Sequence, residues 1–326
     1  MIARREFITL LGGAAAWPIA ARAQQPTPKL PRIGVLVAAS PPHPFADAFQ
    51  HGLRTFGYTE GKNITIQFLY TDARDDRTKE SAAELARANV DVIVAHFTGA
   101  TRAAMAATGT IPIVMAPAGA PLQLGLIASL ARPGGNVTGL SAMDAELGGK
   151  QLQLLRELMP NLVCVAILAA TPATDGGFGE TLVEDLRAAA TKAGLRLVPV
   201  LVGGPDEFAT AFETMSKAGA QAVITQELFD PHRVILIDLA TRRHLALMGG
   251  PETTAAGGLV SMSPNYSALY ERAAFYVDKV LKGAKPADLP VEQPTSLHAA
   301  LNMKTVRALG LTASPMLLEQ VDELIE

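Results

Sequence analysis

The fold is decided by the stretch Ile33-Gly34-Val35-Leu36-Val37 together with the helical pattern that follows it from Phe45 to Phe56. The five apolar residues form a short run that is typical of a strand buried on both faces. The second segment carries its apolar residues at the spacing of one helix face. A buried strand followed by an amphipathic helix is the unit from which parallel sheets are built. The chain therefore begins its folded part as a βαβ protein.

The same alternation continues along the rest of the chain. Up to residue 142 it predicts helices at 77–88 and 101–107 and strands at 63–70, 90–95, 111–115 and 137–140. From residue 147 it predicts helices at 147–159, 180–193, 207–217 and 231–244, with strands at 163–168, 195–200, 222–225 and 245–248 between them. The two halves share one plan without an alignable sequence repeat, so we expect an architectural duplication.

The last part of the chain determines how the halves are joined. It predicts a strand, a long helix and a proline-rich connector, followed by another strand and helix, at 258–262, 266–281, 283–294, 296–302 and 304–309. We therefore expect an α/β fold of two doubly wound parallel-sheet lobes joined by hinge strands, with a ligand cleft at the carboxyl ends of the strands. The expected boundaries are 32–142 plus 255–285 for the first lobe and 143–254 plus 286–326 for the second.

Residues 1–23 have the pattern of an export signal. The charged segment Arg4–Ile8 precedes an apolar run, and Ala21-Arg22-Ala23 offers a cleavage site of small residues. The apolar run is too short for a membrane span, which needs about 20 residues. The paired arginines indicate twin-arginine export, with Sec export or an N-terminal anchor as the alternatives. We expect a periplasmic protein that starts at Gln24, with a linker over 24–31.

Composition narrows the class of protein. The 326 residues are 49% hydrophobic and carry a formal net charge of −3, without a basic tract outside the signal. A large core is therefore possible, whereas nucleic acid and anionic membrane surfaces are not expected partners. Cys164 is the single cysteine and lies in an apolar run, so we expect a buried core residue, no intrachain disulfide and no lipid anchor. We expect a freely diffusing monomer.

Motifs for catalysis are missing from the sequence. The segment after the first strand, Ala38-Ala39-Ser40-Pro41-Pro42, lacks the Gly-x-Gly-x-x-Gly pattern of a dinucleotide site. No Gly-x-Ser-x-Gly elbow and no histidine or cysteine set with metal-ligand spacing occurs. The sequence therefore indicates a binding protein, not an enzyme, with no cofactor and no metal.

Candidate ligand contacts lie in the segments that follow the predicted strands, because those segments face the cleft. Phe45 could pack on a ligand, with a core position as its alternative. Thr98 could meet a carboxylate, with a plain helix cap as its alternative. Gly99 allows close approach of the backbone. The candidates in the first lobe are Ser40, Phe45, Phe97, Thr98, Gly99 and Ala118.

In the second lobe, a glycine-rich segment after a strand supplies Asp175 and Phe178, which offer a charge and a ring. Glu227 and Glu252 follow two other strands and could each pair with an ammonium or hydroxyl group. The alternative for Glu227 is a solvated acid of the loop. Ser263 and Asn265 are weaker candidates.

Several stretches resemble a known family. They are Gly52–Arg54, Gly57–Ile64, Leu281–Val291, Asn302–Thr305 and, above all, Ala128-Ser129-Leu130-Ala131-Arg132-Pro133-Gly134-Gly135-Asn136-Val137-Thr138-Gly139. The chain resembles, from end to end, an ABC transporter substrate-binding protein of the group related to tryptophan- and other aromatic-amino-acid-binding periplasmic proteins. The resemblance implies a type I periplasmic binding fold.

The resemblance also implies a function. Such a protein captures a small solute between its lobes and delivers it to a membrane permease with a cytoplasmic ATPase. The expected ligand is an amino acid, aromatic ones included, or a carboxylate. One departure is that relatives often carry Gly-Asp-Pro where this chain has Gly119-Ala120-Pro121, which removes a possible partner for an ammonium group. The alternative function is a ligand-sensing module that presents its bound state to a membrane signalling receptor.

Overall fold

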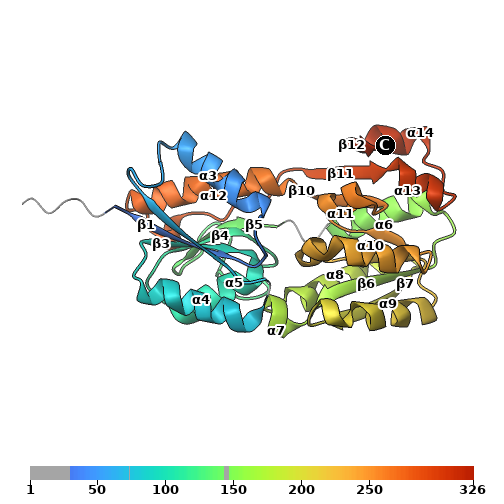
Figure 1. The fold of residues 1–326 in the computed structure, drawn as a ribbon, viewed down its shortest axis with the longest axis horizontal. Coiled ribbons are helices and arrows are strands. Elements are labelled where there is room, and N and C mark those ends of the chain that lie inside the picture. Colours follow the sequence, from blue (N-terminus) through green and yellow to red (C-terminus); the bar gives the residue numbers. More distant parts are fainter. Residues whose placement is uncertain (1–29, 73, 143–146) are drawn as a thin grey trace, which may run out of the picture.

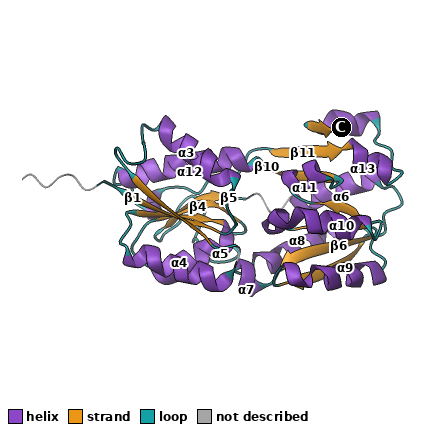
Figure 2. Cartoon of the chain, viewed as in Figure 1, coloured by secondary structure: helices purple, strands orange, loops and turns teal. Residues whose placement is uncertain are grey.

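The computed structural model describes residues 30–72, 74–142 and 147–326. They form two α/β lobes that lie side by side, with helices on both faces of each central sheet (Figures 1 and 2). The predicted export signal and most of the predicted linker lie outside the described residues. Among the helices of the described part, none combines the length and the apolar character needed to cross a membrane.

The first lobe is built on a five-stranded parallel sheet. Its strands in spatial order are β2 (Thr65–Tyr70), β1 (Arg32–Val37), β3 (Val92–His96), β4 (Ile113–Ala118) and β5 (Val137–Ser141). Helices α3 (Pro44–Thr55) and α12 (Tyr266–Leu281) cover one face, and α4 (Asp75–Arg87) and α5 (Phe97–Ala107) cover the other.

Strand β1 shows why this sheet is covered on both sides. Val35 and its alternate neighbours cluster with Phe45 and Phe49 of α3, whereas Leu36 points to the opposite face and clusters with Leu85 of α4. All of these side chains are at most 1% exposed. Alternate residues of a strand face opposite sides, so an uninterrupted apolar strand requires a helix layer on each side.

The second lobe repeats the arrangement. Five parallel strands occur in the order β7 (Arg196–Val202), β6 (Cys164–Ala170), β8 (Ala222–Thr225), β9 (Ala246–Met248) and β10 (Val260–Pro264). This order is the same as β2-β1-β3-β4-β5 in the first sheet, which confirms the predicted duplication. Strand β11 (Leu297–Asn302) then pairs with β10 in the antiparallel direction, and β12 (Glu323–Ile325) extends the sheet.

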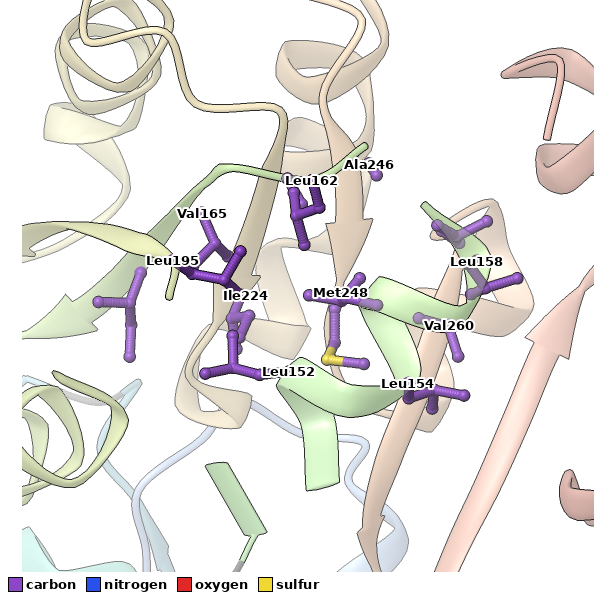
Figure 3. Packing of buried hydrophobic residues seen from close by; sticks show 14 of the residues in the cluster. Leu152, Leu154, Leu158, Leu162, Val165, Leu195, Ile224, Ala246, Met248 and Val260 are labelled. Atoms are coloured by element: carbon purple, nitrogen blue, oxygen red, sulfur yellow. The ribbon is translucent and has the colours of Figure 1, made fainter. Parts of the chain in front are cut away.

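The core of the second lobe fills both faces of its sheet. Helices α6 (Leu147–Leu158) and α8 (Phe178–Ala193) pack on one face, and α9 (Phe208–Lys217) and α10 (Arg233–Thr241) pack on the other. Figure 3 shows Leu152 of α6 beside Ile224 of β8 and Met248 of β9. Short helices α13 (Met303–Ala308) and α14 (Pro315–Gln320) complete that side. Cys164 is buried in β6, as predicted.

The chain passes between the lobes after β5, after β10 and before β11. Two segments lie differently from the predicted boundaries. Strand β10, within the range 255–285 assigned to the first lobe, pairs with β9 and β11 in the second sheet. The beginning of the range 286–326 instead lies along the first lobe, where Val291 donates to Leu130 O at 2.7 Å. In both cases the backbone hydrogen bonds of the segment decide to which lobe it belongs.

The two longest stretches on which the family resemblance rests therefore contact each other. Thr138 donates its hydroxyl to Leu289 O at 2.7 Å, and Asn136 donates its amide to Ile111 O at 2.9 Å. Gly139 pairs with Met115 of β4 and has φ 122°, in the region that favours glycine. These residues attach the connector between the lobes to the edge of the first sheet.

Replacing Gly139 by alanine should lower the free energy of unfolding by about 2 kcal/mol or more. A Cβ atom there would lie 2.6 Å from Met115 N, and the backbone conformation is strained for alanine. Urea unfolding followed by circular dichroism measures the loss. Gly135→Ala, where a Cβ atom meets open space, is the control; equal midpoints for the two variants would contradict the prediction.

Candidate functional site

A cavity of about 70 Å³ lies between the lobes, where the strands of both sheets end. The strand order reverses between β1 and β3 in the first sheet and between β6 and β8 in the second. Such reversal points leave a crevice outside the carboxyl ends of the strands. The cavity is lined from the first lobe by Ala38, Phe97, Thr98, Gly99, Gly119 and Ala142, and from the second mainly by Gln151, Thr174, Asp175, Phe178, Thr225, Gln226 and Glu227.

A second compartment of about 280 Å³ adjoins the first. The two share Ala38, Phe97, Glu227, Leu228 and Tyr266. The second compartment is more polar, because its wall also contains His43, Asp230, Glu252, Asn265, Tyr270 and His298. Among the described residues, neither compartment is lined by lysine or arginine.

Aromatic rings form much of the wall. The rings of Phe97 and Tyr266 meet edge to face, with centroids 6.1 Å apart. Phe178 begins α8 in the second lobe and faces the cavity from the opposite side. A planar apolar group can therefore contact rings from both lobes, an arrangement that suits an aromatic ligand.

The first turn of α5 faces the same cavity through Phe97, Thr98 and Gly99. Within the described part of the chain, no side chain caps this helix. Thr98 is fixed against the end of β4, since its hydroxyl donates to Gly119 O at 3.1 Å and accepts from Gly119 N at 3.0 Å. The N–H groups at a helix start attract a carboxylate, so this turn can hold an acidic group of a ligand.

Asp175 lies in the cavity wall but is already engaged in hydrogen bonds. Its carboxylate accepts from Gly177 N at 2.9 Å, Gly179 N at 2.6 Å and the amide of Gln226 at 2.8 Å. Burial raises the pKa of Asp175, while these hydrogen bonds act in the opposite direction. These hydrogen bonds hold the segment that leads into α8, while the role of Asp175 as a charge partner of a ligand stays a prediction.

Glu227 is the acid that borders both compartments. Two more acids, Asp230 and Glu252, line the second compartment. Glu252 is paired with Arg233 at 3.1 Å. Asp230 accepts from the Thr253 hydroxyl at 2.7 Å, and burial raises the pKa of Asp230 to about 6. Glu227 lies where the two compartments meet, so its position alone places it to face a positively charged group in either one.

Phe45 belongs to the core below the cleft and does not line either compartment. It is fully buried, stacks on His96 at 5.1 Å and meets Tyr270 edge-on at 4.8 Å. Its predicted ligand contact is wrong in this structure, and the core alternative describes it. The reason is that α3 turns this residue toward α12 and the sheet instead of toward the opposite lobe.

Two further candidates also lie outside the compartments. Ser40 is exposed and donates its hydroxyl to Asp72 at 2.7 Å. Ala118 is fully buried as the last residue of β4, and the cavity is bordered by Gly119 beside it. Ala120, at the departure from the Gly-Asp-Pro pattern, is 2% exposed and does not line the cavity either.

The remaining candidates can be placed as well. Phe97, Thr98, Gly99, Phe178 and Glu227 line the first compartment together with Asp175, and Glu252 lies on the second. Asn265 borders the second compartment and caps α12, whereas Ser263 is fully buried in β10. Sequence reasoning missed Gln226, Tyr266 and Tyr270. Gln226 and Tyr266 follow predicted strands almost directly, which is the signal that could have identified them.

Comparison with known proteins gives the family. The family model described as ABC transporter substrate binding protein matches residues 33–325. The chain belongs to this family. Its members are solute-binding proteins, so the function is binding and not catalysis.

Relatives show the same architecture. This substrate-binding protein is 27% identical over 275 residues to a tyrosine-binding protein of Clostridioides difficile, covering 82% of this chain and 78% of the relative. A domain of Streptococcus pneumoniae solved in complex with L-Trp has a TM-score of 0.85 at 25% identity, covering 91% of this chain and all of the other.

A second solved structure with this fold is a ligand-free, open substrate-binding protein with adhesive properties from Clostridium difficile. Its TM-score is 0.63 at 23% identity, over 91% of this chain and 99% of the other. Both solved structures share the fold of this chain.

The histidine next to the site should make the stability of this substrate-binding protein depend on pH. Burial, with a smaller effect of His43, keeps the pKa of His96 well below its usual value. The unfolded chain therefore binds a proton near pH 6.5 that the folded protein does not bind, so stability falls as the pH falls.

We expect that lowering the pH from 7 to 5 decreases the free energy of unfolding of the wild type by about 2 kcal/mol more than that of His96→Gln. Denaturant unfolding at each pH measures the difference. His51→Gln, a substitution of an exposed histidine in α3, is the matched control. Parallel pH profiles for the wild type and His96→Gln would contradict the prediction.

Proposed function

We propose that this protein is the periplasmic receptor of an ABC importer and binds an aromatic amino acid between its lobes. The observation that carries the proposal is one cavity bordered by an uncapped helix start, an acid and aromatic rings. The ligand carboxylate binds the first turn of α5, its ammonium group lies near Glu227, and its ring packs between Phe97 and Phe178.

The charges of the site favour a zwitterion with its acid on the backbone. Among the described residues, lysine and arginine are missing from the walls of both compartments, so a carboxylate has backbone N–H groups as its partners. Glu227 supplies the complementary negative charge for an ammonium group.

The size of the site supports a ligand of amino-acid dimensions. The two adjoining compartments, of about 70 and 280 Å³, together reach the lower end of the range usual for small-molecule sites, about 300–1,000 Å³. The named relatives point in the same direction, since one is a tyrosine-binding protein and another was solved with L-Trp.

The sequence and the family support the proposed location and partner. The pattern of residues 1–23 supports export, and an ABC substrate-binding protein requires a membrane permease to receive its ligand. We propose that the exported protein diffuses as a monomer and delivers its ligand to that permease. Loss of uptake of a labelled aromatic amino acid on deletion of the gene, restored by the wild-type gene, tests this part.

Binding can be measured directly because Trp17 is the only tryptophan of the chain. A protein that starts at Gln24 contains none, so the fluorescence of added L-Trp reports its own transfer into the apolar cavity. L-Tyr and L-Phe are then tested by competition. We expect saturable binding of at least one of the three.

Glu227→Gln should weaken this binding by about tenfold to a hundredfold, because a hydrogen bond to a charged group contributes about 1.5–3 kcal/mol. Glu319→Gln, at an exposed position in α14, is the matched control and should bind like the wild type. Absence of binding for all three amino acids would refute the proposed ligand. Equal affinity of Glu227→Gln and the wild type would refute the role of this acid.

A further inference from the structure

We infer that Gly119 is a positioning residue that controls ligand affinity through Phe178, because only glycine at this position lets the ring of the opposite lobe close over the cavity. This inference rests on the proposed function, since it concerns how the same site closes on its ligand. It assigns a role to a residue that lines the cavity without offering a side chain.

The contact between these two residues crosses the cleft. Gly119 follows β4 in the first lobe, and Phe178 begins α8 in the second. A Cβ atom on Gly119 would lie 2.6 Å from Cδ2 and 2.7 Å from Cζ of the Phe178 ring. Carbon atoms in contact are normally about 3.5–4.0 Å apart, so a methyl group cannot be added while the ring stays in place.

Both partners are held by their own lobes. The backbone N–H and C=O of Gly119 are fixed by the hydroxyl of Thr98. On the other side, Asp175 binds Gly177 N and Gly179 N, the residues on either side of Phe178. A side chain at position 119 must therefore turn the ring toward the cavity or separate the lobes, and either movement opposes ligand binding.

At two other glycines, Gly99 and Gly176, the two lobes also approach each other so closely that a side chain would be crowded. A Cβ atom on Gly176 would lie 2.7 Å from Cδ of Arg102 in α5. A Cβ atom on Gly99 would lie 3.3 Å from Thr174 O. Each of these contacts joins the first lobe to the segment that begins α8, so the lobes meet where side chains are missing.

The role of Gly119 is separable from folding. Its backbone does not have the positive φ that would itself require glycine. The nearest atoms to an added Cβ belong to the opposite lobe, not to the strands and helices around it. Alanine at this position should therefore leave each lobe intact and disturb only their closure.

The first test is a double-mutant cycle with L-Trp as the probe. Gly119→Ala should bind L-Trp about tenfold more weakly, as expected for one overpacked methyl group. In the Phe178→Leu background, the same substitution should change the affinity by less than about threefold, because the ring is gone. Thermal unfolding of ligand-free Gly119→Ala should match that of the wild type. Gly109→Ala, where a Cβ atom meets open space, is the matched control.

A second test needs no ligand and so separates this inference from the proposed function. The radius of gyration of the ligand-free protein, measured by small-angle X-ray scattering, reports how closely the two lobes approach. Because the added methyl group meets the ring of the opposite lobe, Gly119→Ala should have a larger radius of gyration than the wild type and than Gly109→Ala. If no amino acid binds the wild type, the proposed ligand fails while this test still decides the role of Gly119. Equal radii of gyration for Gly119→Ala and the wild type, or the same affinity loss with Phe178→Leu as without it, would overturn the inference.

Discussion

The reversal of strand order at β1/β3 and again at β6/β8 is the constraint on which the rest of this structure depends. At each reversal, neighbouring strands send the chain to opposite faces of the sheet, and the crevice between those crossovers cannot be filled by either helix layer. Because both reversals lie at the carboxyl ends of the strands, placing them face to face creates one shared cavity. The start of α5 borders that cavity for the same reason, since it follows β3 directly.

Polar groups next to the cavity serve to hold its walls. Asp175 accepts from Gly177 N, Gly179 N and the amide of Gln226. Gln226 in turn accepts from Ala170 N at the end of β6, and Thr98 binds Gly119 after β4. Unsatisfied buried polar groups are costly, so these residues are engaged within their own lobe. The backbone on both sides of Phe178 and the first turn of α5 are thereby held by hydrogen bonds within their own lobes.

The fold could be predicted from the sequence more completely than the site. The strand from Ile33 to Val37 is apolar on both faces, and that pattern permits only a sheet with helices on both sides. The site was predicted from the position of residues after strands, which placed Phe97, Phe178 and Glu227 correctly at the cavity. The same reasoning placed Phe45 there as well, because the pattern of a helix shows that a ring is buried but not which layer buries it. The antiparallel pairing of β11 was missed because pairing direction depends on the path of the connector around the first lobe.

The sequence by itself determined the class of fold, the duplication of its plan and the family, because hydrophobic periodicity and local motifs are properties of neighbouring residues. Only the tertiary structure decided how the polar groups of these segments lie at the cavity. Asp175 and Glu227 are both acids in segments after strands. The carboxylate of Asp175 accepts three hydrogen bonds from its own lobe, whereas Glu227 lies where the two compartments meet. The importance of Gly119 also comes from tertiary structure alone. The absence of a side chain at this position matters only because the ring of Phe178 lies against it. Phe178 is 59 residues further along the chain and belongs to the other lobe.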